Sequence, residues 1–273
     1  MLYQQIHLKE EYPFLGVNGA DPQLRTYCLE PVMQNVARPS ILLCPGGGYR
    51  TISGREAEPI ATLLLSWGYN VFVLYYSVGG YAYPTQVREV AAAMELIHKN
   101  AETWNVDTQR IGIMGFSAGG HLAAHYSNIY DCPEIRELFP DSKPVQATVL
   151  GYPVINATPG IGHAGTFQRL SGCDAPTQEQ LEKLCCDKLV TENTPPAFLW
   201  HTATDAAAPV MNSMLYAQAL LEKGIPVSLH IYPFGKHGLS TVDELTNREL
   251  EDRAQMNRLW LTELQQWLKT VLK

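Results

Sequence analysis

The chain has 273 residues, of which 46% are hydrophobic and 17% charged, and its formal net charge is −7. This hydrophobic content supports a substantial core and excludes a largely disordered chain. The acidic balance and the lack of any lysine- or arginine-rich run argue against a nucleic-acid or anionic-membrane partner, because both require clustered cations. We expect a single α/β domain over residues 1–273.

The first segment, MLYQQIHLKEEYPF, lacks the basic start and apolar run of a secretory leader. No stretch reaches the roughly 18 apolar residues of a membrane span. We therefore expect a cytoplasmic protein. Its six cysteines are scattered without a CxxC pair, which predicts reduced structural thiols and no metal site.

Apolar, β-rich segments recur along the chain, separated by helical patterns. We expect strands at 3–8, 24–29, 41–45, 70–76, 110–116, 147–152, 197–202 and 227–232. The first two resemble antiparallel edge strands, whereas several later runs are continuously apolar, as in strands covered on both faces. The alternation predicts a mostly parallel eight-stranded sheet with helices on both faces. Residues 155–195, rich in Gly, Pro, Thr and Cys, predict a small cap or loop over the carboxyl edge of that sheet.

Three segments between and after these strands have helical patterns. Residues 58–68 predict a helix, and Ser53 and Glu56 before it have the spacing of a capping box. In residues 85–104 the apolar side chains recur every three or four positions, which indicates one buried helix face. The final segment, 247–273, predicts a long amphipathic helix.

The segment Gly115-Phe116-Ser117-Ala118-Gly119 is a G-x-S-x-G pattern between a predicted strand and a predicted helix. This is the setting of a nucleophile elbow, where the two glycines let strand and helix approach closely. The serine oxygen then lies at a helix N-terminus, where the helix dipole favours developing negative charge. Neither this stretch nor its surroundings has the spacing of a phosphate-binding loop, so we interpret Ser117 as a nucleophile.

A serine nucleophile needs a base, and the base needs an orienting acid. In α/β-hydrolases the order along the chain is Ser, Asp or Glu, then His, each on a loop after a strand. Of the eight histidines, His237 follows the last predicted strand in a glycine-bounded loop. His201 and His230 lie inside predicted strands, and the other five precede the expected acid. Asp205 directly follows the strand at 197–202 and is the predicted acid.

The sequence CPGGGYR (44–50) begins at the carboxyl end of the strand at 41–45. Three successive glycines let the backbone approach a carbonyl oxygen, so we predict an oxyanion hole formed by the N–H groups of Gly47, Gly48 and Ala118. Four further residues are candidates for the pocket wall or for salt-bridge, packing and loop roles: Tyr49, Arg55, Glu56 and His163.

Together these features resemble the bacterial α/β-hydrolase esterases of the acetyl-xylan and sugar acetyl esterase branch. The resemblance covers nearly the whole chain. It rests on PGGGY (45–49), REAEPIA (55–61), GYNVFVLYYSV (68–78), GFSAGGHLAA (115–124), GYPVI (151–155), TPPAFLWHTATD (194–205), PVMNSMLYAQALLEKGIPVSLHIYPFGKHGL (209–239) and the terminal WLTELQQWL.

The resemblance implies a serine carboxylesterase that removes short acyl groups, typically acetyl, from sugars such as acetylated xylo-oligosaccharides. It implies the triad Ser117, His237 and Asp205, a small-molecule ester substrate and no metal or organic cofactor. One departure is TATDAAAPV (202–210), where the family carries a larger apolar residue before the proline; this bears on the acyl or sugar pocket. The alternatives are a general short-chain carboxylesterase, an arylformamidase-type amide hydrolase and a non-catalytic ligand-binding homologue.

Overall fold

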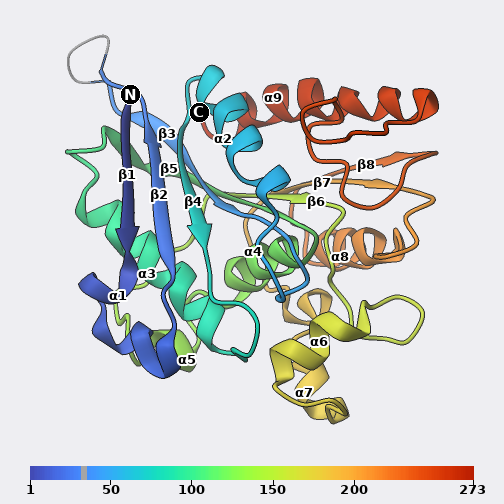
Figure 1. Ribbon diagram of the computed structural model, residues 1–273, viewed down its shortest axis with the longest axis horizontal. Helices are drawn as coiled ribbons and strands as arrows, with labels where there is room; N and C mark the ends of the chain where they lie inside the picture. The colour runs from blue at the N-terminus through green and yellow to red at the C-terminus, as the bar shows by residue number, and fades with distance from the viewer. Residues whose placement is uncertain (32–35) are drawn as a thin grey trace.

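The computed structural model describes residues 1–31 and 36–273, and eight strands in them form one twisted sheet (Figure 1). In chain order these are β1 (Leu2–His7), β2 (Gln23–Cys28), β3 (Arg38–Cys44), β4 (Asn70–Tyr75), β5 (Val106–Phe116), β6 (Ala147–Gly151), β7 (Ala197–Thr202) and β8 (Val227–Tyr232). Their order across the sheet is β1-β2-β4-β3-β5-β6-β7-β8. β2 is antiparallel to both of its neighbours, and all other pairs are parallel. The predicted mostly parallel eight-stranded sheet is confirmed.

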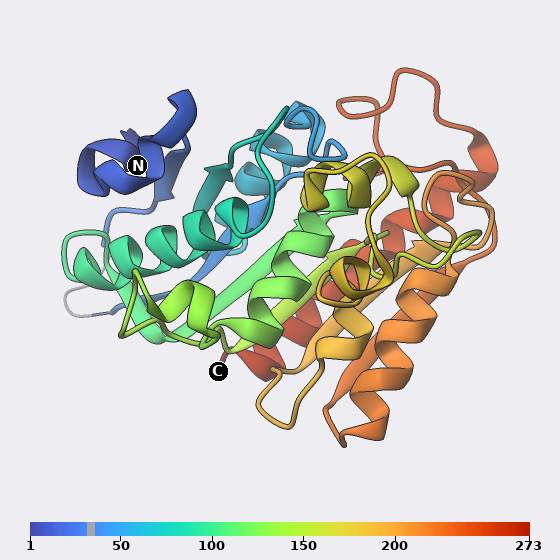
Figure 2. The same cartoon turned by 90° about the horizontal axis from the view of Figure 1, so that it is seen from below.

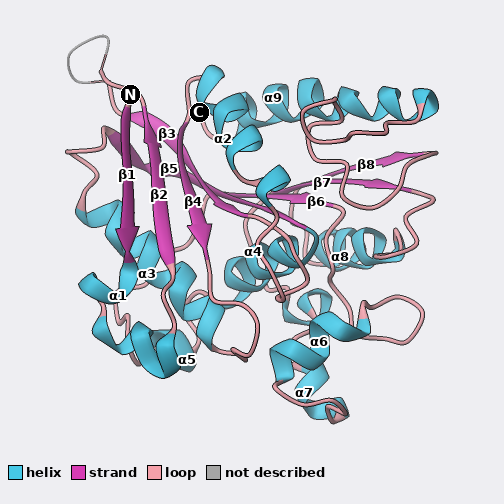
Figure 3. Ribbon diagram, viewed as in Figure 1, coloured by secondary structure: helices cyan, strands magenta, loops and turns pink. Residues whose placement is uncertain are grey.

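Helices cover both faces of this sheet (Figures 1 and 3). On one face lie α2 (Glu58–Ser66) and α9 (Leu259–Val271), and on the other lie α3 (Thr85–Lys99), α4 (Ser117–Ile129) and α8 (Met211–Glu222). The view from below shows α3, α4 and α8 running across the sheet (Figure 2). The shorter elements are α1 (Leu8–Glu11), α5 (Pro133–Arg136), α6 (Ala164–Ser171), α7 (Gln178–Glu182) and the 3-10 segments η1 (Pro13–Gly19), η2 (Gly54–Glu56), η3 (Cys186–Leu189) and η4 (Asp252–Arg258). In the described part of the chain no helix is long and apolar enough to cross a bilayer.

Two apolar cores sandwich the sheet, because successive strand residues point to opposite faces. In β3, Ile41 packs in the core beneath α2 and α9, whereas Leu42 packs in the core that includes α3 and α4. Val149 and Leu150 of β6 divide in the same way, and all four side chains are fully buried. Burial on both faces explains the continuous apolar runs of the central strands.

The structure corrects two helical predictions. Ser53 makes no capping hydrogen bond, and the carboxylate of Glu56 turns inward to the backbone of Gly46 instead of capping a helix. The terminal helix is shorter than predicted, because η4 precedes α9 and residues 247–251 are not helical. The side-chain amide of Asn247 donates to the Leu239 carbonyl oxygen at 2.8 Å, so this residue anchors a loop.

The parallel strands place several loops at one edge of the sheet. The loops after the carboxyl ends of β3, β5, β7 and β8 meet there, as is usual for ligand sites of parallel sheets. The predicted excursion over residues 155–195 lies between β6 and β7 and contains α6, α7 and η3. These loops and this excursion build the candidate site.

Candidate active site

The turn from β5 to α4 carries the predicted nucleophile. Ser117 follows the last residue of β5 and has a φ of +53°, in the left-handed region that non-glycine residues seldom adopt. A Cβ atom at Gly115 would overlap the carbonyl oxygen of Gly119, and one at Gly119 would overlap that of Cys44. The two glycines of the pattern are therefore required by close backbone contact between the strands and α4.

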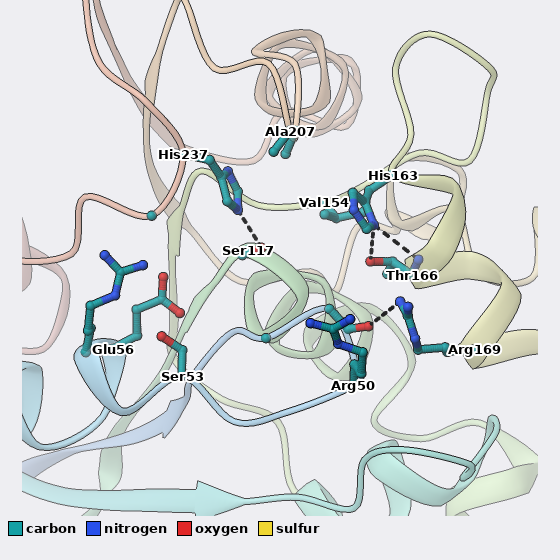
Figure 4. A pocket seen from close by; sticks show the side chains of 15 residues that line it. Arg50, Ser53, Glu56, Ser117, Val154, His163, Thr166, Arg169, Ala207 and His237 are labelled. Carbon is teal, nitrogen blue, oxygen red and sulfur yellow. Dashed lines mark hydrogen bonds between the residues drawn. The ribbon is translucent and has the colours of Figure 1, made fainter.

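Ser117, His237 and Asp205 come together in a hydrogen-bonded chain. The Nε2 atom of His237 lies 2.8 Å from the Ser117 Oγ (Figure 4), and its Nδ1 atom lies 2.6 Å from Oδ2 of Asp205. The predicted nucleophile, base and acid thus lie at the distances that proton transfer requires. The three residues follow the carboxyl ends of β5, β8 and β7, and Ser117 is the first residue of α4.

Asp205 is held as a carboxylate by its surroundings. Its Oδ1 atom accepts hydrogen bonds from the backbone N–H groups of Ala207 and Ala208, both at 2.9 Å, and His201 Nε2 lies 3.4 Å from Oδ2. Burial alone would raise the pKa of the Asp205 carboxyl, but hydrogen bonds from His201 and His237 hold this pKa well below its ordinary value. His201, predicted only as a strand residue, therefore contacts the predicted acid of the triad.

The glycine loop after β3 forms one wall of the site. Gly47 and Gly48 have φ values of +130° and +65°, and both line the pocket beside Ser117. Among the described residues, no protein acceptor pairs with the N–H groups of Gly47 and Gly48. Tyr49, by contrast, does not reach the pocket: it is buried, and its hydroxyl lies 3.0 Å from Nδ1 of His121.

Glu56 connects the glycine loop to the loop that carries His237. Its side chain is 3% exposed, and its Oε2 atom accepts the backbone N–H of Gly46 at 2.9 Å. Its Oε1 atom accepts the hydroxyl of Tyr152 at 2.7 Å, and that hydroxyl accepts the N–H of Ser240 at 3.0 Å. The Tyr152 ring also packs edge-on against the His237 ring at 5.0 Å between centroids. One buried carboxylate therefore braces both loops.

The pocket at Ser117 has a volume of about 390 Å³. Of the four extra candidates, Arg55, Glu56 and His163 line it. Six further lining residues were not predicted for the pocket: Arg50, Ser53, Val154, Thr166, Arg169 and Gly238. Ala207 and Ala208 also line it, and both lie in the TATDAAAPV segment that was expected to bear on the pocket.

The excursion between β6 and β7 supplies a second wall. His163 caps α6 by accepting the N–H of Thr166 at 3.2 Å, and burial together with the charge of Arg169 lowers the pKa of His163. Arg169 Nη1 donates to the carbonyl oxygens of Gly165 at 2.7 Å and Gly48 at 3.0 Å. The excursion is thus tied to the glycine loop. In residues 1–31 and 36–273 no three His, Cys, Asp or Glu side chains form a metal-binding cluster.

Comparison with known proteins shows similarity over most of the chain. The BD-FAE family model matches residues 28–220. The chain is 36% identical over 252 residues to the Endo-1,4-beta-xylanase B of Butyrivibrio fibrisolvens, covering 88% of this chain and 38% of that protein. It is 29% identical over 226 residues to the Acetylxylan esterase of Xylanibacter ruminicola, covering 80% and 44% respectively. The chain thus spans less than half the length of these two relatives.

A solved structure matches at nearly full length. The acetyl ester-xyloside bifunctional hydrolase of Caldicellulosiruptor lactoaceticus superposes with a TM-score of 0.83 and 33% identity, covering 98% of this chain and 96% of that chain. The similarity therefore includes the whole sheet and the loops at its carboxyl edge.

Proposed function

Because the chain belongs to the BD-FAE family and has the α/β-hydrolase fold, we propose that it is a serine carboxylesterase that removes acetyl groups from sugars. The observation that carries this proposal is the hydrogen-bonded chain from Ser117 through His237 to Asp205. The names of the relatives, an acetylxylan esterase and an acetyl ester-xyloside hydrolase, support the acetylated sugar as substrate.

In the first half of the reaction, Ser117 Oγ attacks the carbonyl carbon of the ester while His237 Nε2 takes the hydroxyl proton. The negative charge that develops on the carbonyl oxygen is held by the N–H groups of Gly47, Gly48 and Ala118. Each such donor contributes a factor of about 10²–10³ to the rate. His237 then gives its proton to the sugar oxygen, and the sugar alcohol leaves.

In the second half, water replaces the sugar. His237 takes a proton from this water, which attacks the acetyl-serine, and the proton then returns to Ser117 as acetate leaves. Asp205 stays ionised throughout because its pKa is lowered, so it stabilises the imidazolium that forms in both halves. The carboxylate also fixes the ring with its Nε2 atom toward the serine.

The pocket fits a short acyl group. Its volume of about 390 Å³ lies near the lower end of the range for small-molecule sites. Its lining combines glycines and alanines with three arginines, a glutamate and a histidine. Small residues beside polar groups suit an acetyl group on a sugar better than a long acyl chain.

Acetate release from acetylated xylo-oligosaccharides tests the proposal, with wild type measured beside Ser117→Ala. Ser66→Ala, on the exposed surface of α2, is the matched control and should retain full activity. Loss of acetate release in Ser117→Ala alone supports both the nucleophile and the sugar ester. If wild type cleaves 4-nitrophenyl acetate but no sugar acetate, the sugar assignment is wrong. Equal activity of wild type and Ser117→Ala would refute the triad.

A further inference from the structure

Positive charge gathers in the pocket of a protein whose net charge is −7. Three arginines line it, Arg50, Arg55 and Arg169, against the single carboxylate of Glu56. Among the described residues, none of the three guanidinium groups lies within 4.0 Å of a carboxylate oxygen. The pocket wall therefore carries an excess of cations without anionic partners.

The nearby carboxylates are already engaged elsewhere. Both oxygens of Glu56 accept hydrogen bonds, from Gly46 and from Tyr152. Asp205 is bonded to His237 and to two backbone N–H groups. The ring of His163 is neutral or cationic and supplies no negative charge, and its lowered pKa favours the neutral form. An anion that enters the pocket would thus meet guanidinium groups free of competing carboxylates.

Two of the arginines are placed to receive such an anion. Arg169 is oriented by the two carbonyl oxygens that its Nη1 atom contacts, which leaves its Nε and Nη2 atoms without a protein acceptor in the described residues. Arg50 is exposed, and although its backbone N–H donates to the Gly47 carbonyl oxygen at 3.1 Å, its guanidinium group makes no hydrogen bond to the described chain. Both project into the pocket on the side of Ser117 opposite His237 in Figure 4. Arg55 instead donates to the Thr246 carbonyl oxygen.

We propose that the substrate is an anionic ester, whose charged group binds Arg50 and Arg169 while its acyl group lies at Ser117. Guanidinium groups pair in a bidentate manner with carboxylates and phosphates. Among sugar acetates, this chemistry selects an acetylated sugar that carries a uronic acid or a phosphate. The proposal rests on the esterase function above and names its substrate class.

The test uses two acetylated xylo-oligosaccharides of equal length, one of which carries a uronic acid branch. For wild type at low salt we expect a KM at least about fivefold lower for the acidic substrate, and a smaller preference at high salt. Arg50→Gln should bring the ratio of the two KM values close to one, and Arg50→Lys should restore part of the preference. Arg248→Gln removes an exposed charge outside the pocket and should keep the wild-type ratio.

The outcomes separate this proposal from the esterase function. Equal KM values for both substrates in wild type overturn the anion site and leave the esterase function intact. If no acetate is released from either, the esterase function fails, and calorimetric binding of both oligosaccharides to Ser117→Ala decides the anion site. Tighter binding of the acidic one then supports the site, and equal binding overturns it.

Inhibition of 4-nitrophenyl acetate hydrolysis identifies the anionic group. Glucuronate, glucose 6-phosphate and glucose are compared as competitors, because they share a sugar ring and differ in charge. Stronger inhibition by glucuronate assigns a carboxylate, and stronger inhibition by glucose 6-phosphate assigns a phosphate. If neither glucuronate nor glucose 6-phosphate inhibits more strongly than glucose, the proposal is wrong.

Discussion

Replacement of Glu56 by glutamine tests how the site is braced. The two side chains have the same shape, but glutamine has one acceptor oxygen where Glu56 has two, accepting from Gly46 N–H and Tyr152 O–H. One buried hydrogen bond is therefore lost. A hydrogen bond to a charged group contributes about 1.5–3 kcal/mol, so we expect the free energy of unfolding to fall by about 2–3 kcal/mol. Glu56→Ala loses both bonds, and its loss should be about twice as large.

The same substitution should slow catalysis. Gly46 directly precedes the predicted oxyanion donors Gly47 and Gly48, and Tyr152 packs on the ring of His237. A shift of these groups weakens transition-state contacts more than ground-state binding. We expect kcat to fall by about 10- to 100-fold, less than the 10²–10³ expected for complete loss of one donor. KM should change much less than kcat.

Urea unfolding and steady-state hydrolysis of 4-nitrophenyl acetate measure both effects. Glu58→Gln, two residues away and exposed, is the matched control for loss of one negative charge. If Glu56→Gln unfolds within about 0.5 kcal/mol of wild type, the ordinary range for surface changes, the bracing role is wrong. A kcat equal to that of Glu58→Gln would refute the catalytic consequence.

Three further predictions follow from the geometry. Asp205→Asn should lower kcat by a factor on the order of 10⁴, because the amide favours the wrong tautomer of the triad imidazole. Steady-state hydrolysis of 4-nitrophenyl acetate measures this, and a fall in kcat of less than tenfold relative to wild type would contradict it. Gly119→Ala forces a methyl group into the backbone of β3 and should lower the urea midpoint sharply, whereas Gly54→Ala, with open space around it, should not. Burial lowers the pKa of His121 to about 4 and of His125 to about 3, so the unfolded chain takes up protons first as pH falls below the ordinary 6.5. Each histidine should therefore lower the free energy of unfolding by about 2 kcal/mol between pH 7.5 and pH 5. Urea unfolding at both pH values checks this: if the free energy of unfolding of His125→Gln falls as much as that of wild type, this origin is wrong.

The meeting of Ser117, Asp205 and His237 was predictable because it follows from topology. Ser117 directly follows an apolar run long enough for a strand, and Asp205 and His237 lie three and five residues beyond such runs. Parallel strands bring such positions to one edge of the sheet whatever their separation along the chain. The glycines beside Ser117 were predictable for a similar reason, since the elbow demands close backbone contact.

The bracing and charged residues were not predictable, because they depend on side-chain direction. Ser53 and Glu56 have capping-box spacing, yet the helix begins at Glu58 and the Glu56 carboxylate turns inward. Arg169 lies in an excursion whose path over the sheet no periodicity encodes. Local spacing therefore indicated the elements, whereas long-range packing determined which polar groups meet.

The excursion over residues 155–195 lines the pocket without contributing a predicted triad residue. It holds no triad residue, yet it supplies His163, Thr166 and Arg169 to the pocket wall. Its ties to the rest of the protein include the Arg169 contact with the Gly48 carbonyl and the Leu184 carbonyl at 2.7 Å from His121 Nε2. A chimera that keeps these ties and exchanges the rest of the segment should acquire a different substrate range while cleaving the same bond. Under the proposed function, changes confined to this segment therefore alter which substrate is recognised and leave the reacting groups in place.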